Sequence, residues 1–422
     1  MHFFSSKTER EKPIFPKKGT LSSVDFIFCC LNSAFSYGIL KLGSVFTSGL
    51  IFTYIILIIV SFLSFYSLKL FVLSAAYYHE GTFEEIWREA FSKTTLFIPI
   101  FATIFSSLVN MTTYIKNIQS SIVNIGSKIV SLLNEDGKEI INDLQAYKML
   151  LGSGVFILFL LPQCISSSIH TMAIISFISF GCIIFFLIYS VCMFGYQVKT
   201  KGFDITHSIK YFQINQQSAK SLAVLIFAFE FYPLTYPGLR DCKDSRKSNL
   251  FKVFFIIIIF IFIIYATIGT FNYLTFFDET KIGIILDHFP DDTEAEKILL
   301  IIGNILTLFF VLQTIPFRLN SCRYVLLSTI NSLTSFPHDI WAFMGIIICL
   351  LALALSNLTD DYLIFLEVGN NIMASILLYI IPPILYIKAY KVSDCWHFTI
   401  AIILLTVGIL ATIFMIIYNG FY

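Results

Sequence analysis

The chain has 422 residues, of which 57% are hydrophobic and only 13% are charged, and its net charge at pH 7 is +1. Soluble globular proteins carry roughly 25% charged residues, so water cannot be the main solvent of this surface. The balanced charge and the absence of a long basic stripe in the sequence give no sign of a nucleic-acid partner.

The first residues are polar and mixed in charge, which argues against a cleaved signal peptide. We therefore expect residues 1–23 to form a cytoplasmic tail and the first apolar run to stay in the membrane. The nine cysteines fall almost entirely in apolar segments or short loops, and no disulfide framework is predicted.

A helix needs about 20 apolar residues to cross the hydrocarbon core of a bilayer. Eleven segments meet this rule, so the sequence predicts an all-α polytopic membrane protein with a transmembrane domain over residues 24–418. In chain order the segments are Val24–Ser44, Phe46–Ala76, Leu96–Ile125, Tyr147–Gln163, His170–Phe194, Ser221–Leu239, Leu250–Phe276, Ile298–Leu319, Asp339–Ser356, Tyr362–Ile387 and Trp396–Tyr418.

Lysine and arginine favour the cytoplasmic side of a membrane protein. With the N-terminus inside, sixteen of these residues lie in cytoplasmic segments and nine on the opposite side. The sixteen include Arg240, Arg318 and Arg323. The distribution predicts a cytoplasmic N-terminus, while the plasma membrane and an acidic vacuolar or lysosomal membrane both remain open.

Two of the predicted spans resist a continuous helix. The first contains the polar stretch 32–38, and the sixth contains 229–238 with two prolines, Pro233 and Pro237. Proline removes an amide donor and clashes with the preceding turn. Backbone groups freed at membrane depth must be satisfied by protein, water or a ligand. The alternative is that both stretches are ordinary kinks packed by neighbouring helices.

The first and sixth spans each open a half of five spans, about 24–194 and about 221–387, with 396–418 as an extra helix. Interrupted helices at matching positions of two halves point to a transporter binding site. The sequence thus predicts a 5+5 inverted repeat plus one helix.

Several motifs run nearly end to end along the chain. They are Asn32–Leu40, Leu161–Gln163 with Ile175–Ser176, Phe227–Pro233, Tyr265–Phe276 and Ile315–Arg318. In this order and spacing they resemble the amino acid/auxin permease family, which is part of the APC superfamily. Members of this family share an eleven-span version of the LeuT-type fold. The resemblance implies a secondary active transporter that moves amino acids by alternating access, as a symporter coupled to protons or sodium.

Three positions differ from the family pattern. Ser36 stands where the family has a second glycine, Gly43 where it often has proline, and Tyr232 where it has histidine. These differences leave the substrate and the coupling ion open.

An amino acid is a zwitterion, so its site must supply donors to a carboxylate and acceptors to an ammonium. The resemblance implies that amides of the first interruption bind the carboxylate and that carbonyls of the sixth span bind the ammonium. Two tyrosines would shape the pocket. The implied substrate-binding residues are Ser36, Tyr37, Gly38, Phe227, Ala228, Phe229 and Tyr232.

The resemblance also implies a sodium site at Asn32 and Thr307, whose oxygens suit a hard cation. The alternative for Asn32 is a hydrogen bond to a neighbouring helix. No other cofactor or metal is expected.

Glu230 is a carboxylate at the middle of a span, where charge costs about 2.5–3.5 kcal/mol on insertion scales. It should therefore face a cavity or a partner. Three roles are open: a titrating group in proton coupling, a contact for the ammonium of a cationic substrate, and a structural pair with Lys116 in the third span.

Other function classes fit less well. The seven histidines all lie in loops or at span ends, so the chemistry of an enzyme is not expected. No repeated pore-lining filter indicates a channel. A receptor or sensor that binds an amino acid without translocating it remains an alternative. The expected partners are an amino acid and the lipid bilayer, and a monomer is the simplest working unit.

Overall fold

A computed structural model gives the fold of the chain. The residues it describes are 12–15, 19–35, 39, 42–91, 93–133, 138–160, 162, 169–201, 209–213, 216–231, 239–277, 286, 293–331, 338–358, 360–390 and 395–420. Within these ranges the regular structure is helical and contains no strand, apart from one isolated β-bridge between Leu21 and Cys242.

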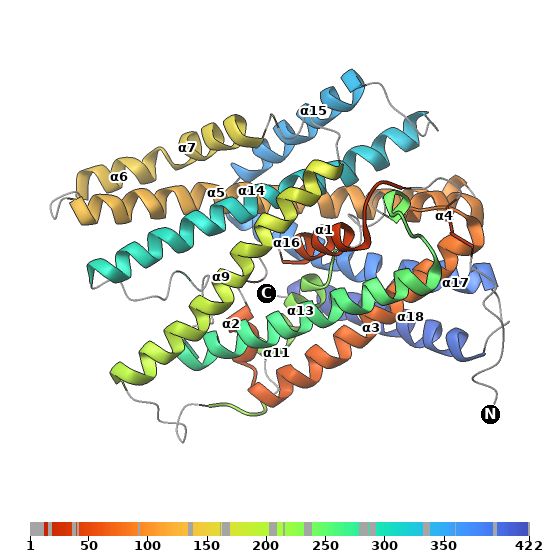
Figure 1. The fold of residues 1–422 in the computed structure, drawn as a ribbon, viewed down its shortest axis with the longest axis horizontal. Helices are drawn as coiled ribbons and strands as arrows, with labels where there is room; N and C mark the ends of the chain where they lie inside the picture. The colour runs from red at the N-terminus through yellow and green to blue at the C-terminus, as the bar shows by residue number, and fades with distance from the viewer. Residues whose placement is uncertain are drawn as a thin grey trace.

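The helices form one bundle (Figure 1). Their bounds are α1 (Ser23–Ala34), α2 (Leu42–Phe46), α3 (Leu50–Tyr78), α4 (Phe83–Ala90), α5 (Phe97–Leu133), α6 (Lys138–Ala146), α7 (Lys148–Val155), α9 (Ile169–Lys201), α11 (Gln216–Ala228), α13 (Lys247–Phe276), α14 (Glu294–Asn331), α15 (His338–Ser356), α16 (Asp360–Ser375), α17 (Ile381–Tyr390) and α18 (Cys395–Gly420). A 3₁₀ turn precedes α5, and π-helical turns follow α7 and join α16 to α17.

Eight helices in the described part of the chain are long and apolar enough to cross a membrane. They confirm a multi-pass membrane protein and occupy eight of the predicted spans. The first, fourth and sixth predicted spans correspond to shorter helices, namely α1 with α2, α7 and α11. Eleven crossings therefore remain a prediction.

Three helices are longer than the hydropathy predicts, and α9, which ends at Lys201 rather than Phe194, is one of them. The third span ends at Leu133 rather than Ile125, and the eighth continues through Pro316 to Asn331 rather than ending at Leu319. The additional part of α14 includes Arg323, which is fully buried. A hydropathy rule detects helix segments whose side chains are apolar enough for lipid. It misses a continuation of the helix in which polar side chains such as Arg323 are buried against protein.

The long helices α5 and α14 lie side by side, and the short α1 packs between α9 and α13 (Figure 1). The outer faces carry exposed apolar side chains such as Ile58 and Phe62, as expected for a surface in lipid. Close packing inside the bundle depends on small residues. A Cβ at Gly269 would lie 2.2 Å from the ring of Phe46, so α13 and α2 can meet only with glycine there.

Candidate functional site

The first predicted interruption coincides with a helix end. Ser22 and Asp25 form a capping box at the start of α1, and the helix ends at Ala34. Phe35 has φ −79° and ψ 56°, which is not helical, and helix resumes in α2. Thus the first span is not one continuous helix. Ser36, Tyr37 and Gly38 lie outside the described residues.

The second predicted interruption also coincides with a helix end. Helix α11 ends at Ala228, and the next three residues are not helical, with the Phe231 amide donating to the Phe229 carbonyl at 3.1 Å. The chain is helical again at Leu239. Tyr232 and the two prolines lie outside the described residues, as does the side chain of Phe227.

One tyrosine of α13 contacts both helix ends. The Tyr265 hydroxyl lies 2.8 Å from the carbonyl oxygen of Ala34 and 2.9 Å from that of Ala228. Its ring also packs edge-on against Phe35 and Phe229, with centroids 5.5 and 5.9 Å away. The last carbonyls of a helix have no partner within it. The single hydroxyl proton of Tyr265 is within hydrogen-bond distance of both oxygens and is shared between them. Sequence reasoning missed this residue.

Glu230 lies just beyond the end of α11 and is 1% exposed. Its Oε1 is 3.3 Å from Nη1 of Arg318 on α14, and Nη2 of Arg318 donates to the Glu230 main-chain carbonyl at 3.0 Å. Ser106 of α5 donates to Oε1, and Asn110, one turn further along α5, donates to Oε2 at 3.3 Å. Two long helices thus hold the chain where α11 is interrupted.

The ion-pair partner of Glu230 is therefore Arg318, not Lys116, which one of the sequence alternatives proposed. The sequence had placed Arg318 and Arg323 among the cytoplasmic cations, but they are 1% and 0% exposed. Without them the charge bias falls to fourteen against nine. A buried cation needs an anion as its partner. The sequence would have identified Arg318 as buried, and so as a partner for Glu230, only if α14 had been predicted to continue past Pro316.

Asn32 is fully buried near the end of α1. Its Nδ2 lies 3.4 Å from Oγ of Ser176 on α9, which is the bond to a neighbouring helix that one alternative expected. The other end of its amide, Oδ1, is buried and accepts no hydrogen bond from the described residues. A buried carbonyl oxygen without a donor suits a cation.

Thr307 is also buried, in the first half of α14, and its hydroxyl donates to the Gly303 carbonyl in the same helix. No hydrogen bond joins Thr307 to Asn32 in the described part of the chain. Of the expected sodium pair, Asn32 thus has a buried oxygen that no described donor bonds, while the Thr307 hydroxyl is bonded within its own helix.

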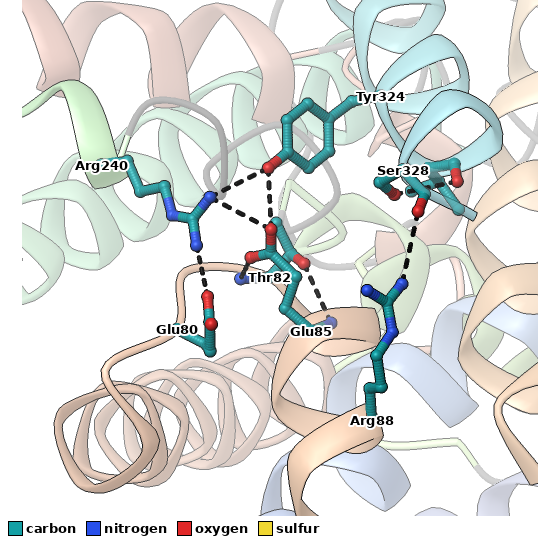
Figure 2. Close-up of polar contacts among 8 residues, drawn as sticks. Glu80, Thr82, Glu85, Arg88, Arg240, Tyr324 and Ser328 are labelled. Carbon is teal, nitrogen blue, oxygen red and sulfur yellow. Dashed lines mark hydrogen bonds and ion pairs between the residues drawn. The ribbon is translucent and has the colours of Figure 1, made fainter. Parts of the chain in front are cut away.

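A second cluster of charges ties three separate segments together (Figure 2). Arg240, which follows the second interruption, pairs with Glu80 after α3 and with Glu85 of α4, the latter at 3.1 Å. The Tyr324 hydroxyl of α14 donates to Glu85 at 2.9 Å and accepts from Arg240 at 3.1 Å. Gly81 permits the approach, since a Cβ there would lie 2.8 Å from the Arg240 side chain.

The chain before α1 meets the same segment. The Leu21 amide donates to the Asp241 carbonyl, and the Lys243 amide donates to the Leu21 carbonyl, both at 2.8 Å. A Cβ at Gly19 would lie 2.0 Å from the Asp241 backbone, so only glycine allows this contact. We call Arg240, Glu80, Glu85 and Tyr324 together with this pairing the tail-side network.

Glu84 provides a test of the electrostatics beside the tail-side network. Burial on α4 raises the pKa of its carboxyl to about 7, although Thr103 donates to it at 2.8 Å. The folded protein then holds a proton that the unfolded chain releases near pH 4.5. Stability should therefore fall as the pH rises from about 4.5 to 7 and stay lower above it, by an amount on the order of 2–3 kcal/mol.

Glu84→Gln should remove this pH-dependent loss, so the variant should unfold at a higher temperature than the parent at pH 8 and near the same temperature at pH 5. Thermal unfolding in detergent at both pH values measures it. Equal gains at both pH values, or none, would contradict the assignment.

The interrupted helices, joined by Tyr265 and anchored by Glu230, lie in a bundle of long apolar helices and define the LeuT-type class of transporter fold. Solved structures with this fold include MhsT in complex with L-phenylalanine, at 13% identity and a TM-score of 0.62, covering 95% of this chain and 99% of that one. Mhp1, a nucleobase-cation-symport-1 family transporter, in a closed conformation with bromovinylhydantoin bound, matches at 12% identity and a TM-score of 0.60, covering 97% of this chain and 96% of that one.

A family model described as transmembrane amino acid transporter protein matches residues 19–421, and the chain belongs to this family. The protein is therefore a multi-pass membrane transporter with a small-molecule substrate. Membership also confirms the expectation that it is not an enzyme.

Proposed function

We propose that the protein is a secondary active transporter that moves amino acids by alternating access. The observation that carries the proposal is the meeting of both interrupted helices at the Tyr265 hydroxyl, with the Glu230–Arg318 pair beside it. Helix ends present amides and carbonyls that have no partner within the helix, and a carbonyl oxygen can accept a second hydrogen bond, so such ends can bind both charges of a zwitterion. MhsT, on the same fold, is in complex with L-phenylalanine, which is consistent with this substrate class.

The substrate would lie between the two helix ends. The amides of Ser36, Tyr37 and Gly38 would bind its carboxylate, and carbonyls near Ala228 and Phe229 would bind its ammonium. Arg318 already fills the cation position beside Glu230, which disfavours Glu230 as the contact for a cationic side chain. This favours a substrate with a neutral side chain. Phe227 and Tyr232 would line the remaining pocket.

Sodium is the coupling ion that the buried oxygen of Asn32 favours over a proton. Asn32→Ala should raise the sodium concentration for half-maximal uptake by about tenfold or more, the equivalent of losing one ligand worth roughly 1.4 kcal/mol. Uptake against a sodium titration measures this. Ser179→Ala, on the neighbouring helix α9, is the comparison variant: it removes a buried hydroxyl and keeps the side-chain amide of Asn32, so its sodium dependence should stay near that of the parent.

Sodium dependence that is unchanged in Asn32→Ala would exclude this site. Uptake driven by a pH gradient alone in the parent protein would instead favour proton coupling.

Alternating access requires contacts that close one side of the transporter and break when that side opens. The ion pairs of the tail-side network are of this kind. Its pairs are about one-third exposed or less, and its four residues come from three segments, one of them directly after the second interruption. With the N-terminus inside, as the charge bias favours, the network would close the cytoplasmic side.

Arg240→Gln should therefore favour the open state on that side. Uptake should fall, and Cys242, which is 3% exposed, should react several-fold faster with a maleimide added from the cytoplasm, in line with loss of a coupling worth about 1 kcal/mol. Arg246→Gln removes an exposed pair with Asp244 and is the matched control. Equal labelling of Cys242 in both variants would show that the network is not a closure.

One experiment tests the function as a whole. The purified protein in proteoliposomes is offered a panel of twenty labelled amino acids, with sodium and pH gradients imposed separately. Accumulation above the outside concentration supports secondary active transport. Binding without accumulation would support the receptor alternative.

A further inference from the structure

A groove of about 420 Å³ lies away from the interrupted helices, between the second half of α9 and the first turns of α14. Tyr189 and Met193 form its floor and are 6% and 8% exposed. Ile188, Tyr196 and Leu299 form its edges and are 54%, 44% and 39% exposed. The lining is almost wholly apolar.

Both helices that form the groove are long and apolar enough to cross a membrane. We therefore expect the apolar edges of the groove, such as Ile188 and Leu299, to face lipid. The volume is that of a small-molecule site, since such pockets span roughly 300–1,000 Å³. Its occupant must come from the bilayer.

One end of the groove is polar. The Tyr196 hydroxyl donates to Oε1 of Glu296 at 3.1 Å, and the Thr293 amide donates to Oε2 at 2.9 Å in a capping box that begins α14. The candidate membrane span of α14 begins at Glu294, so we expect this polar end to lie near the membrane surface. A carboxylate there repels a phosphate headgroup but can accept from a neutral hydroxyl, since each of its oxygens accepts more than one hydrogen bond.

Part of the apolar lining is aromatic. The rings of Phe185 and Tyr189 are stacked, with centroids 5.7 Å apart and planes at 20°, so each restricts the other. A rigid hydrocarbon loses less conformational entropy on binding to such a lining than a flexible acyl chain does. The geometry points to a sterol, a neutral polycyclic alcohol with its ring system on Phe185 and Tyr189 and its hydroxyl at Glu296.

A photoreactive sterol in nanodiscs that contain the full chain tests this. Labelling should map to the helix turns around Tyr189 and Leu299 and should be displaced by unlabelled sterol but not by phospholipid. Met193→Trp, which fills the floor, should lower the labelling by about tenfold or more, and Tyr196→Phe should lower it less. Ile409→Trp, on the exposed face of α18, is the control with the same added ring.

Tyr196→Phe keeps the ring and removes only the hydroxyl that positions Glu296, so it decides the question even if Met193→Trp fails to fold. Labelling that is unchanged in Tyr196→Phe, or in a folded Met193→Trp, or that phospholipid displaces as well as sterol does, would overturn the proposal. The sterol site does not depend on the proposed transport function, because uptake can be present or absent in either outcome.

Discussion

Glu230→Gln is expected to abolish uptake and to destabilise the protein by about 3–5 kcal/mol, since it leaves the guanidinium of Arg318 buried without a carboxylate. The Glu230–Arg318 pair fixes the position of the chain directly after α11, where the backbone no longer forms helical hydrogen bonds. Losing it should therefore affect both folding and the position of the substrate site.

The double variant Glu230→Gln with Arg318→Met separates the two effects. Removing both charges removes the uncompensated cation, so much of the thermal stability should return while uptake stays absent. Asp244→Asn, in an exposed pair with Arg246, is the matched control and should change stability by less than about 1 kcal/mol.

Thermal unfolding and initial uptake rates measure both quantities. Uptake near the parent rate in Glu230→Gln would show that the pair has no part in transport. If residual uptake of the variant keeps the parent's pH profile, Glu230 is not the group that couples protons.

Sequence reasoning located both helix interruptions because their causes are local. Two prolines within five residues cannot continue a helix, and a polar stretch with glycine in the first span resists one. Helix α1 does end at Ala34, within the first predicted stretch, and α11 ends at Ala228, directly before the second. The number of crossings was harder to fix, since interrupted spans leave helices too short for a hydropathy rule.

The residues that hold the interruptions together could not be predicted in this way. Arg318 follows a proline near the end of an apolar run, a pattern that also fits a cytoplasmic boundary. Tyr265 begins one of the motifs shared with the family, but it is one of 21 tyrosines and the motif assigned its hydroxyl no role. Its role depends on three helices meeting, and only the three-dimensional arrangement shows that.

Tyr265→Phe should lower uptake by about tenfold or more and stability by about 1–3 kcal/mol, because it removes the one hydroxyl donor that two carbonyls at helix ends share. The ring and its packing against Phe35 and Phe229 are kept, so the hydroxyl alone is tested. A substrate that binds between misplaced helix ends binds more weakly, so KM should rise more than the maximal rate falls.

Tyr54→Phe is the matched control, since the Tyr54 hydroxyl bonds the Thr270 side chain at 2.8 Å, where α3 packs on the same helix α13. That loss leaves every backbone carbonyl with its partner, so stability should change by no more than about 1 kcal/mol and KM should stay near the parent value. Uptake kinetics and thermal unfolding of the two variants decide the matter. If they behave alike, the hydroxyl of Tyr265 is an ordinary buried group, and the two helix ends are held by the packing of α1 on α9 and α13 and by the Glu230–Arg318 pair after α11.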